Sequence, residues 1–357
     1  MIIPHMDTRR REFLESLLTT PGPSGYEADS QRVWLDYVSE FADEVRTDDY
    51  GNAVAKVEGG DTTVALAGHG DEIGFIVRDL TDDGFVKLGR IGGSDKTVSR
   101  GQHVTIHTAD GPVSGVVGQT AIHLRDSDDD SVPEIAEQHV DVGAEDGDEV
   151  ESLVDRGDPV TFVQTLSELE NGRLAARGMD NRIGIWAAAE GLRRAAEAGA
   201  DATVYAVSTV QEEVGVQGAK MVGFDLAPDV AIAVDVTHAT DSPGSPGKAD
   251  TGVELGAGPV VARGSANHPV AVDALRETGK EEDIDIQLQA TGSRTGTDAD
   301  AFYTSRGGIP SVNVGLPNRY MHTPVEVIDP DDLDVLADLL AGFAVRAADR
   351  APFSVDV

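Results

Sequence analysis

Apolar residues follow helical and strand periods in turn along the first part of the chain. They recur at helical spacing between about Thr8 and Leu18 and again around Val33 to Val38, which predicts two amphipathic helices. A turn at Gly51 and Asn52 predicts a junction between two short strands. The apolar run Val64–Ala67 predicts a buried strand. This order of elements is typical of an α/β domain, in which helices cover a sheet.

Between about Gly74 and Gln164 the pattern changes to short alternating segments with glycine-rich turns between them, such as Gln102–His107 and Val113–Val117. Such spacing predicts hairpins and therefore a small β-rich unit. The acidic run Arg125–Ser131 inside this unit predicts a solvated loop.

From Gly178 onward the α/β alternation resumes. We therefore predict one α/β domain, formed by residues 1–73 and 166–357, with a β-rich insertion at 74–165. The pattern predicts helices over Arg182–Ala198, Ala271–Thr278 and Asp331–Ala348, and strands over Val204–Val210, Val230–Val234, Ile284–Leu288 and Ser311–Val314.

The charge balance is strongly acidic. Asp and Glu number 64 against 28 Lys and Arg, so the formal net charge is −36, while 40% of the residues are hydrophobic and can form a core. Little basic charge is available to neutralise phosphates, so the balance argues against binding of a nucleic-acid backbone. Only six of the basic residues are lysine. A folded, acidic, lysine-poor chain indicates adaptation to a salt-rich cytoplasm, with an ordinary acidic protein as the alternative.

The chain has no cysteine, so any metal must be held by histidine and carboxylate side chains. Its first residues contain no apolar segment of signal-peptide length, and no run approaches the roughly 18 apolar residues of a membrane span. These features predict a soluble, cytoplasmic protein without membrane contact.

Histidine and acidic residues occur at the predicted ends of strands and helices. His69 follows the strand Val64–Ala67, and Asp71 two residues later could orient its imidazole. Asp180 precedes a predicted helix, where Asp180 or Asn181 could equally be an ordinary helix cap. A structural hydrogen-bonding role for His69 is also open.

Three further strands end in similar residues. Glu212 and Glu213 follow Val204–Val210, and such a pair is costly to bury unless a cation binds it, although a solvated acidic turn is the alternative. Asp235 follows Val230–Val234, where structural hydrogen bonding is the other interpretation, and His322 lies in the loop beyond Ser311–Val314. Together, these oxygen and nitrogen donors suit Zn²⁺, Co²⁺ or Mn²⁺.

These segments resemble the TET-type dinuclear-metal aminopeptidases, which include glutamyl and deblocking aminopeptidases. The resemblance spans almost the whole chain. The matching segments are Pro21–Glu27, His69–Gly74, Met179–Arg182, Gln211–Gly215, Asp235 and Arg319–Glu326.

The resemblance implies a role for each matching residue. One of two divalent metal ions, most simply Zn or Co, would be held by His69 and Asp235, and the second by Glu213 and His322. Asp180 would bridge the two ions. Asp71 would support His69, and Glu212 would be the general base that takes a proton from water.

The resemblance also implies a mixed sheet flanked by helices, with the β-rich insertion acting as a dimerisation domain. Its activity would be the removal of N-terminal residues from short peptides. In that family, dimers assemble into a twelve-subunit tetrahedral shell.

Three other functions compete with this hypothesis. A related dinuclear-metal deacylase or carboxypeptidase would share the ligands but cleave another amide. A glycoside hydrolase, such as an endoglucanase, also uses paired carboxylates, but it usually needs no transition metal and displays aromatic sugar platforms, whereas aromatic residues are only 5% here. A non-enzymatic scaffold with a degenerate metal site is the third.

The acidic composition predicts that folding and assembly both depend on salt. Molar KCl shortens the Debye length to about 3 Å and screens the repulsion among carboxylates. Thermal melting and light-scattering mass, measured across a KCl series, should both rise with salt. Equal melting temperature and mass at low and molar KCl would contradict adaptation to salt.

Overall fold

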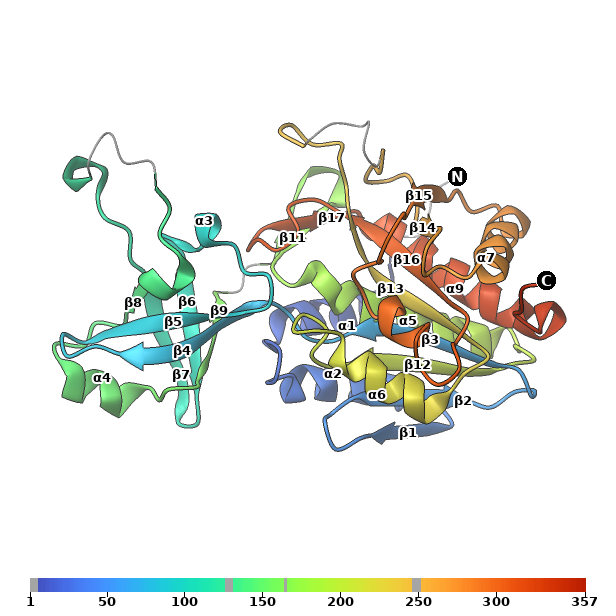
Figure 1. Ribbon diagram of the computed structural model, residues 1–357, viewed down its shortest axis with the longest axis horizontal. Helices are drawn as coiled ribbons and strands as arrows, with labels where there is room; N and C mark the ends of the chain where they lie inside the picture. Colours follow the sequence, from blue (N-terminus) through green and yellow to red (C-terminus); the bar gives the residue numbers. More distant parts are fainter. Residues whose placement is uncertain (1–5, 126–130, 164–165, 246–251) are drawn as a thin grey trace.

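The computed structural model describes residues 6–125, 131–163, 166–245 and 252–357, and residues 126–130 of the predicted acidic loop lie outside this part. Its centre is an eight-stranded mixed sheet in the order β1-β2-β12-β3-β13-β16-β14-β15 (Figure 1). The four central strands, β12, β3, β13 and β16, are parallel. The strands are β1 (Glu44–Thr47), β2 (Ala53–Val57), β3 (Thr63–His69), β12 (Thr203–Thr209), β13 (Val230–His238), β14 (Val260–Arg263), β15 (Gln287–Ala290) and β16 (Ser311–Asn318).

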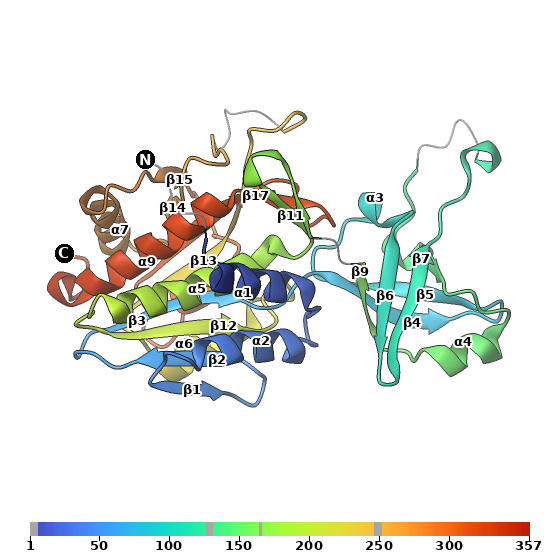
Figure 2. The same ribbon diagram turned by 180° about the vertical axis from the view of Figure 1, so that it is seen from behind.

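Helices cover both faces of this sheet. One face carries five helices, which Figure 2 shows from their own side, and the other carries α6 and α8. The helices of the first face are α1 (Thr8–Thr19), α2 (Ala28–Val38), α5 (Met179–Glu197), α7 (Pro269–Glu281) and α9 (Pro330–Arg350), and those of the second are α6 (Gln217–Leu226) and α8 (Ala299–Phe302).

Strand β3 contributes side chains to two apolar cores, one on each face of the sheet. Successive side chains of a strand point to opposite faces of the sheet. Val64 and Leu66 therefore pack among the five helices, whereas Ala65 and Ala67 pack against α6 and α8. Every one of these side chains is buried, which accounts for the continuous apolar run in the sequence.

The insertion forms a closed antiparallel barrel in the order β4-β5-β8-β7-β6-β9, beside the sheet domain (Figure 1). It has its own apolar core, centred on Phe75, Leu88, Ile106 and Val160. The barrel strands are β4 (Gly74–Leu80), β5 (Phe85–Ile91), β6 (His103–Thr108), β7 (Gly111–Val117), β8 (His139–Asp141) and β9 (Pro159–Phe162), and the intervening helices are α3 (Lys96–Ser99), η1 (Ile122–Leu124), η2 (Ile135–Glu137) and α4 (Gly147–Leu153).

A separate three-stranded sheet lies next to the site described below. It consists of β10 (Ser167–Glu168), β11 (Leu174–Ala176) and β17 (Glu326–Ile328), with η3 (Glu170–Gly172) between the first two strands. Strand β11 leads into the start of α5, and β17 follows the loop that leaves β16. This sheet thus connects two segments that are far apart in sequence.

The predicted fold class, a mixed sheet flanked by helices with a small β-rich insertion, is confirmed. Several elements differ from the prediction. Strand β15 begins at Gln287, not Ile284, because the backbone N–H of Ile284 donates to the carbonyl of Gly279 near the end of α7 and not to a neighbouring strand. The periodicity also missed β14 and α6, and it missed α4, so the insertion is not purely β.

The close approach of β3 to α5 generates a stability prediction. A Cβ atom added at Gly68 would lie 2.7 Å from the carbonyl carbon of Gly184, a contact that the backbone must move to relieve. We expect Gly68→Ala to lower the free energy of unfolding by roughly 1–3 kcal/mol in chemical denaturation. Gly307→Ala is the matched control because a Cβ there meets nothing within 4 Å. Equal stability of the two variants would show that β3 and α5 are not in tight contact.

Candidate metal centre

The predicted site residues meet at one edge of the central sheet. Strands β12, β3, β13 and β16 are parallel neighbours, so their carboxyl ends lie together, where ligands of open α/β sheets commonly bind. His69 ends β3, the acidic pair follows β12, Asp235 lies within β13, and His322 lies in the loop after β16. Asp180 reaches the same edge from the start of α5.

Three of these strands, β3, β13 and β16, run further than the sequence predicts. His69 is the last residue of β3, and Asp235 is an interior residue of β13, which continues to His238. The backbone of both residues is therefore fixed by sheet hydrogen bonds and not by a loop, which favours accurate placement of the side chains.

At the start of α5, Asn181 and not Asp180 is the residue that caps the helix. Its side-chain oxygen accepts a hydrogen bond from the backbone N–H of Gly184 at 3.0 Å, which caps the helix. Its amide group donates to the carbonyl of Val234 at 2.7 Å and so ties the helix start to β13. The peptide bond between Asp180 and Asn181 is cis. Because Asn181 makes the cap, the carboxylate of Asp180 is left to face the cavity.

His69 faces three carboxylates through one nitrogen. Its Nε2 lies 3.2 Å from Oδ1 of Asp180 and 3.7 Å from Oδ1 of Asp235. Oε2 of Glu212 is 3.8 Å from the same nitrogen. On the other side of the ring, Nδ1 lies 3.2 Å from the backbone oxygen of Asp71 and 3.3 Å from its Oδ1. Asp71 can therefore fix the orientation of the ring, with Nε2 directed at the cavity.

His322 faces the other side of Asp180. Its Nε2 lies 3.2 Å from Oδ2 of Asp180 and 3.4 Å from Oε1 of Glu213. The two oxygens of Asp180 are thus directed at two different imidazoles, each of which has a further carboxylate close by. A carboxylate that bridges two cations needs this arrangement.

The nitrogen and oxygen atoms at this site suit divalent cations as ligands. Ligand atoms of His69, Asp180 and Glu213 all lie within 4.8 Å of one another. Oδ1 of Asp180 is buried and lacks a hydrogen-bond donor, since its contact with His69 is outside hydrogen-bond geometry. A buried carboxylate oxygen in this state is costly unless a cation binds it. Histidine nitrogen with carboxylate oxygen is a ligand set typical of Zn²⁺ and of related first-row ions.

Electrostatics supports the same interpretation. Hydrogen bonds with Asp180 and Glu213 raise the pKa of His322 to about 11, although burial opposes this. Burial would lower the pKa of His69, but the charge of Glu212 and contacts with Asp180 and Asp235 raise it well above its ordinary value. Without a metal ion, protons on the imidazoles thus supply the positive charge that the carboxylates require. Metal ions would displace these protons.

The turn that carries Glu212 and Glu213 is held by two buried carboxylates. The N–H groups of Glu212 and Glu213 donate to the two oxygens of Asp71, at 3.0 and 3.2 Å. The N–H of Gln211 donates to Oε1 of Glu27 at 3.1 Å. Ser24 completes the shell of Asp71, donating its hydroxyl at 2.6 Å. Although burial opposes it, the interaction with His69 lowers the pKa of Asp71, which stays ionised to accept these bonds.

Sequence reasoning assigned no role to two buried acids around the centre. Glu27 and Glu326 lie within segments that carry the family resemblance. Glu27 accepts from the N–H of Gln211, next to the glutamate pair, and Glu326 accepts from the N–H groups of Asp180 and His322. Their signal in the sequence is a place at the end of a matching segment, which does not by itself assign a role to an acid in a chain with 64 of them.

The centre opens into a cavity of about 350 Å³. Six of the seven predicted residues line it, and Asp71 lies behind them. The remaining wall is mainly neutral and polar, with hydroxyl and amide groups of Thr237, Gln289, Thr291, Thr297 and Asn313.

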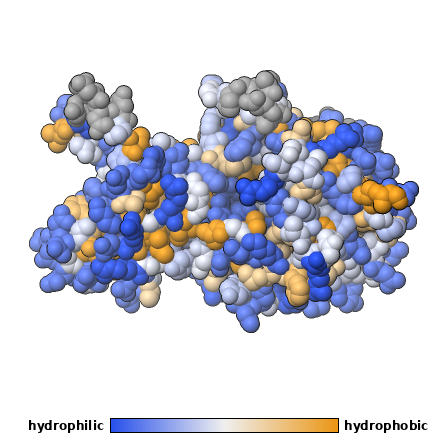
Figure 3. All heavy atoms as spheres, in the orientation of Figure 1, coloured by the Kyte–Doolittle hydropathy of each residue, from blue (hydrophilic) through white to orange (hydrophobic). Residues whose placement is uncertain are grey.

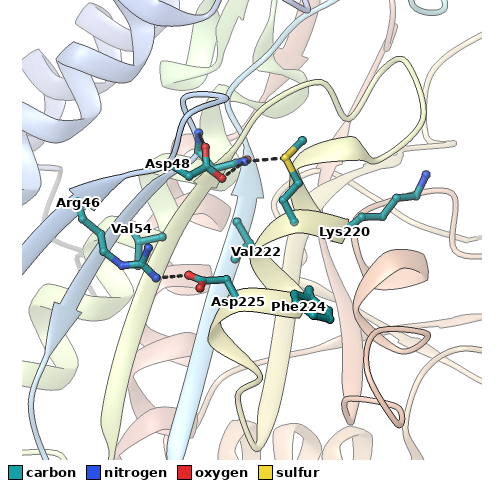
Figure 4. A pocket seen from close by; sticks show the side chains of 9 residues that line it. Arg46, Asp48, Val54, Lys220, Val222, Phe224 and Asp225 are labelled. Atoms are coloured by element: carbon teal, nitrogen blue, oxygen red, sulfur yellow. Dashed lines mark hydrogen bonds and ion pairs between the residues drawn. The ribbon is translucent and has the colours of Figure 1, made fainter.

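A larger hollow of about 510 Å³ lies beside α6 and strands β1 and β2 (Figure 4). Its charged groups are already paired: Arg46 contacts Asp225, Asp48 accepts from Asn52, and Lys220 donates to the backbone of Gly215. None of the residues predicted for catalysis lines it. The chemistry therefore belongs to the smaller cavity.

Comparison with known proteins agrees with this geometry. Residues 51–339 match the model of the family described as M42 glutamyl aminopeptidase. The chain belongs to this family. M42 enzymes are metal-dependent aminopeptidases, so the chain is a peptide hydrolase that uses divalent metal.

Individual relatives extend over nearly the whole chain. The lysyl aminopeptidase of Pyrococcus furiosus is 35% identical over 327 residues, which cover 90% of this chain and 93% of the relative. The structure of a TET aminopeptidase from a marine sediment thaumarchaeon has a TM-score of 0.91 at 29% identity and covers 97% of this chain and 99% of that one. The TET1 peptidase of Pyrococcus horikoshii has a TM-score of 0.83 at 30% identity, with 94% and 99% covered.

Within the described residues, none of the helices of this M42 chain has the length and apolar character needed to cross a membrane.

The raised pKa of Glu27 predicts how the stability of the metal-free protein changes with pH. Burial raises its pKa to about 7 from 4.5, so between these values the folded state binds more protons than the unfolded state, and stability falls as pH rises. This difference in pKa corresponds to on the order of 3 kcal/mol. Gln at this position keeps Oε1, which accepts from both Gly25 and Gln211, and removes the charge.

We therefore expect Glu27→Gln to be more stable than the parent protein above about pH 7 and to lose this advantage near pH 4.5. Chemical denaturation at a series of pH values with chelator measures the difference. A difference that does not change with pH would contradict the raised pKa of Glu27.

Proposed function

We propose that this M42 enzyme removes N-terminal residues from short peptides with two divalent metal ions, Zn or Co, and with Glu212 as general base. The observation that carries the proposal is the position of Asp180, whose two oxygens face His69 and His322 separately. Each imidazole with its nearby carboxylate then forms one half of a two-cation site.

In the proposed centre, His69 and Asp235 hold one ion, Glu213 and His322 hold the other, and Asp180 bridges them. When bound, two such ions lower the pKa of water and polarise a peptide carbonyl. Asp71 holds His69 and the backbone of both glutamates, so the ligands of the two halves keep a fixed spacing.

Glu212 is the residue left free to move a proton. It lines the cavity, and its Oε2 is 3.8 Å from His69 Nε2, beyond hydrogen-bond distance. Burial raises its pKa to about 10, against the opposing effect of His69, so the carboxylate has a high proton affinity. Positive charge bound beside it would bring this pKa down towards neutrality, where a carboxylate can accept a proton and return it to the leaving amine.

The charge of the cavity supports recognition of a free amino terminus. Four acidic side chains line it, and its described lining residues include no Lys or Arg. A protonated amine is attracted by such a wall, whereas the free carboxylate that a carboxypeptidase must bind is not. This favours an aminopeptidase over the related carboxypeptidase or deacylase. Relatives are named for different N-terminal residues, lysyl and glutamyl, so the preference of this chain is a separate question.

Glycoside hydrolysis is the second candidate because one similar structure is described as an endoglucanase from Thermotoga maritima, with a TM-score of 0.76 at 26% identity. The cavity supports it less well. The described residues that line it include no Trp, Tyr or Phe on which a sugar ring could stack, and three histidines stand among the acids.

We also propose that residues 74–165 form a dimerisation domain and that dimers assemble further in a salt-rich cytoplasm. Apolar residues gather on the barrel in Figure 3, and exposed Val116 and Val163 belong to this insertion. Exposed apolar clusters often mark contacts between proteins. The Pyrococcus horikoshii TET1 peptidase can assemble into a tetrahedron or a large octahedral shell, and the structure of PhTET1-12s is described as a dodecamer. Both support a twelve-subunit shell here.

Glu212→Gln tests the proposed base. The variant keeps the size of the side chain and removes its proton affinity, so kcat on aminoacyl substrates should fall roughly 10²–10⁴-fold while metal content stays at the parent level. Glu58→Gln, which alters an exposed residue, should keep full activity. Measurements in molar KCl with metal-loaded protein provide the comparison. Substantial turnover by Glu212→Gln would remove this residue from the role of base.

The same assay with chelator separates the candidate functions. Aminopeptidase turnover should disappear with chelator and return when Zn²⁺ or Co²⁺ is added. Cellulase activity that persists in chelator would instead favour glycoside hydrolysis. Cleavage of N-acylated peptides in preference to peptides with a free amine would favour a deacylase.

A further inference from the structure

Glu326 is a buried acid at the start of β17 that has no place in the proposed chemistry. Its side chain is 2% exposed, and it does not line the cavity. Its backbone is fixed on one side by pairing with Ala176 of β11. The next residue, Val327, exchanges two backbone hydrogen bonds with Arg319, each 3.0 Å long. Glu326 therefore sits on a rigid strand.

Both oxygens of Glu326 accept hydrogen bonds from the backbone of proposed ligands. Oε1 accepts from the N–H of His322 at 2.9 Å, and Oε2 accepts from the N–H of Asp180 at 2.9 Å. The side-chain amide of Asn318 lies 3.4 Å from Oε2. One carboxylate thus joins the start of α5 to the loop between β16 and β17.

The backbone N–H groups of Asp180 and His322 need a hydrogen-bond acceptor from elsewhere in the chain. His322 has φ of 63° and Tyr320 has φ of 62°, in the left-handed region that side chains disfavour, so the loop is held in a conformation that costs energy. Asp180 has φ of −77° and ψ of 105°, which is not helical, so its N–H has no place in the hydrogen-bond ladder of α5. The two oxygens of a glutamate side chain can each accept from one such donor.

We propose that Glu326 is a positioning residue that sets the spacing between Asp180 and His322, so that their side chains can bind the same metal ion. The proposal rests on the proposed function, since that function makes these two residues ligands. Oδ2 of Asp180 and Nε2 of His322 are 3.2 Å apart, and Glu326 holds the two backbones from which they extend. It acts on metal binding without touching the metal or the substrate.

Glu326→Gln should remove one of the two backbone hydrogen bonds with little change in side-chain volume. A glutamine keeps one acceptor oxygen and replaces the other by an NH₂ group, which only donates and cannot bond to a backbone N–H. Either Asp180 or His322 then loses its partner. Loss of an interaction that orients a metal ligand typically weakens metal binding by roughly 10–100-fold.

Asp332 offers a matched control. It lies in α9 and is 3% exposed, and its two oxygens accept from the backbone N–H groups of Gly256 and Gly258, at 2.7 and 2.8 Å. The same chemistry is thus present at a place that carries no proposed ligand. Asp332→Asn should cost stability in the same way as Glu326→Gln and leave metal binding unchanged.

The experiment is a titration of metal-free protein with Co²⁺, followed by visible absorption and by calorimetry, on the parent and both variants. We expect Glu326→Gln to bind Co²⁺ roughly 10–100-fold more weakly and Asp332→Asn to match the parent protein. Hydrogen exchange of the metal-free proteins gives a second measurement, because peptides that contain Asp180 and His322 should exchange faster only in Glu326→Gln.

Parent-like Co²⁺ affinity in Glu326→Gln, or equal weakening in both variants, would overturn the positioning role. These results differ from failure of the proposed function itself. In that case the parent protein would bind no Co²⁺ at this centre or would show no chelator-sensitive hydrolysis. If the parent protein binds Co²⁺ and hydrolyses peptides, the comparison of the variants tests the role of Glu326 alone.

Discussion

Mutual repulsion among buried carboxylates is the constraint on which this site depends. Asp180, Glu212, Glu213 and Asp235 converge on one small cavity, whose described lining includes three imidazoles and no Lys or Arg. Such a cluster is stable only if positive charge enters it, because desolvation penalises each anion and proximity penalises all of them. Protons on His69 and His322 supply part of that charge. Divalent cations supply more of it in the same volume and are the charge used by the M42 family.

Further buried acids hold the backbone of the site in place by accepting hydrogen bonds from its N–H groups. Asp71, Glu27 and Glu326 do not face the cavity, and each accepts hydrogen bonds from N–H groups of site residues or their neighbours. The parallel strands fix His69 and Asp235 through the sheet. The remaining proposed ligands lie on turns and at a helix start, where the backbone lacks such partners. At these places a buried acid accepts the backbone hydrogen bonds instead. Acidic residues therefore act in two ways in this protein, as proposed ligands and as the supports that hold those ligands.

The sequence predicted that the proposed ligands lie at one edge of the sheet because apolar runs ending in His or Asp mark the carboxyl ends of parallel strands. His69 and Asp235 were found in this way. Asp180 was ambiguous, since only the contact between Asn181 and Gly184 shows which residue caps the helix. Glu326 could not be found from local pattern, because its function is to join segments separated by 146 residues. Closure of the barrel and strand β14 depend on similar long-range pairing and left no periodic signal.

Anomalous diffraction from crystals of the Zn²⁺-loaded protein tests the two-cation centre most directly. Two peaks should appear on either side of Asp180, one next to His69 and Asp235 and the other next to Glu213 and His322. A single peak away from Asp180, or none in the cavity, would contradict the assignment of these residues as a dinuclear centre.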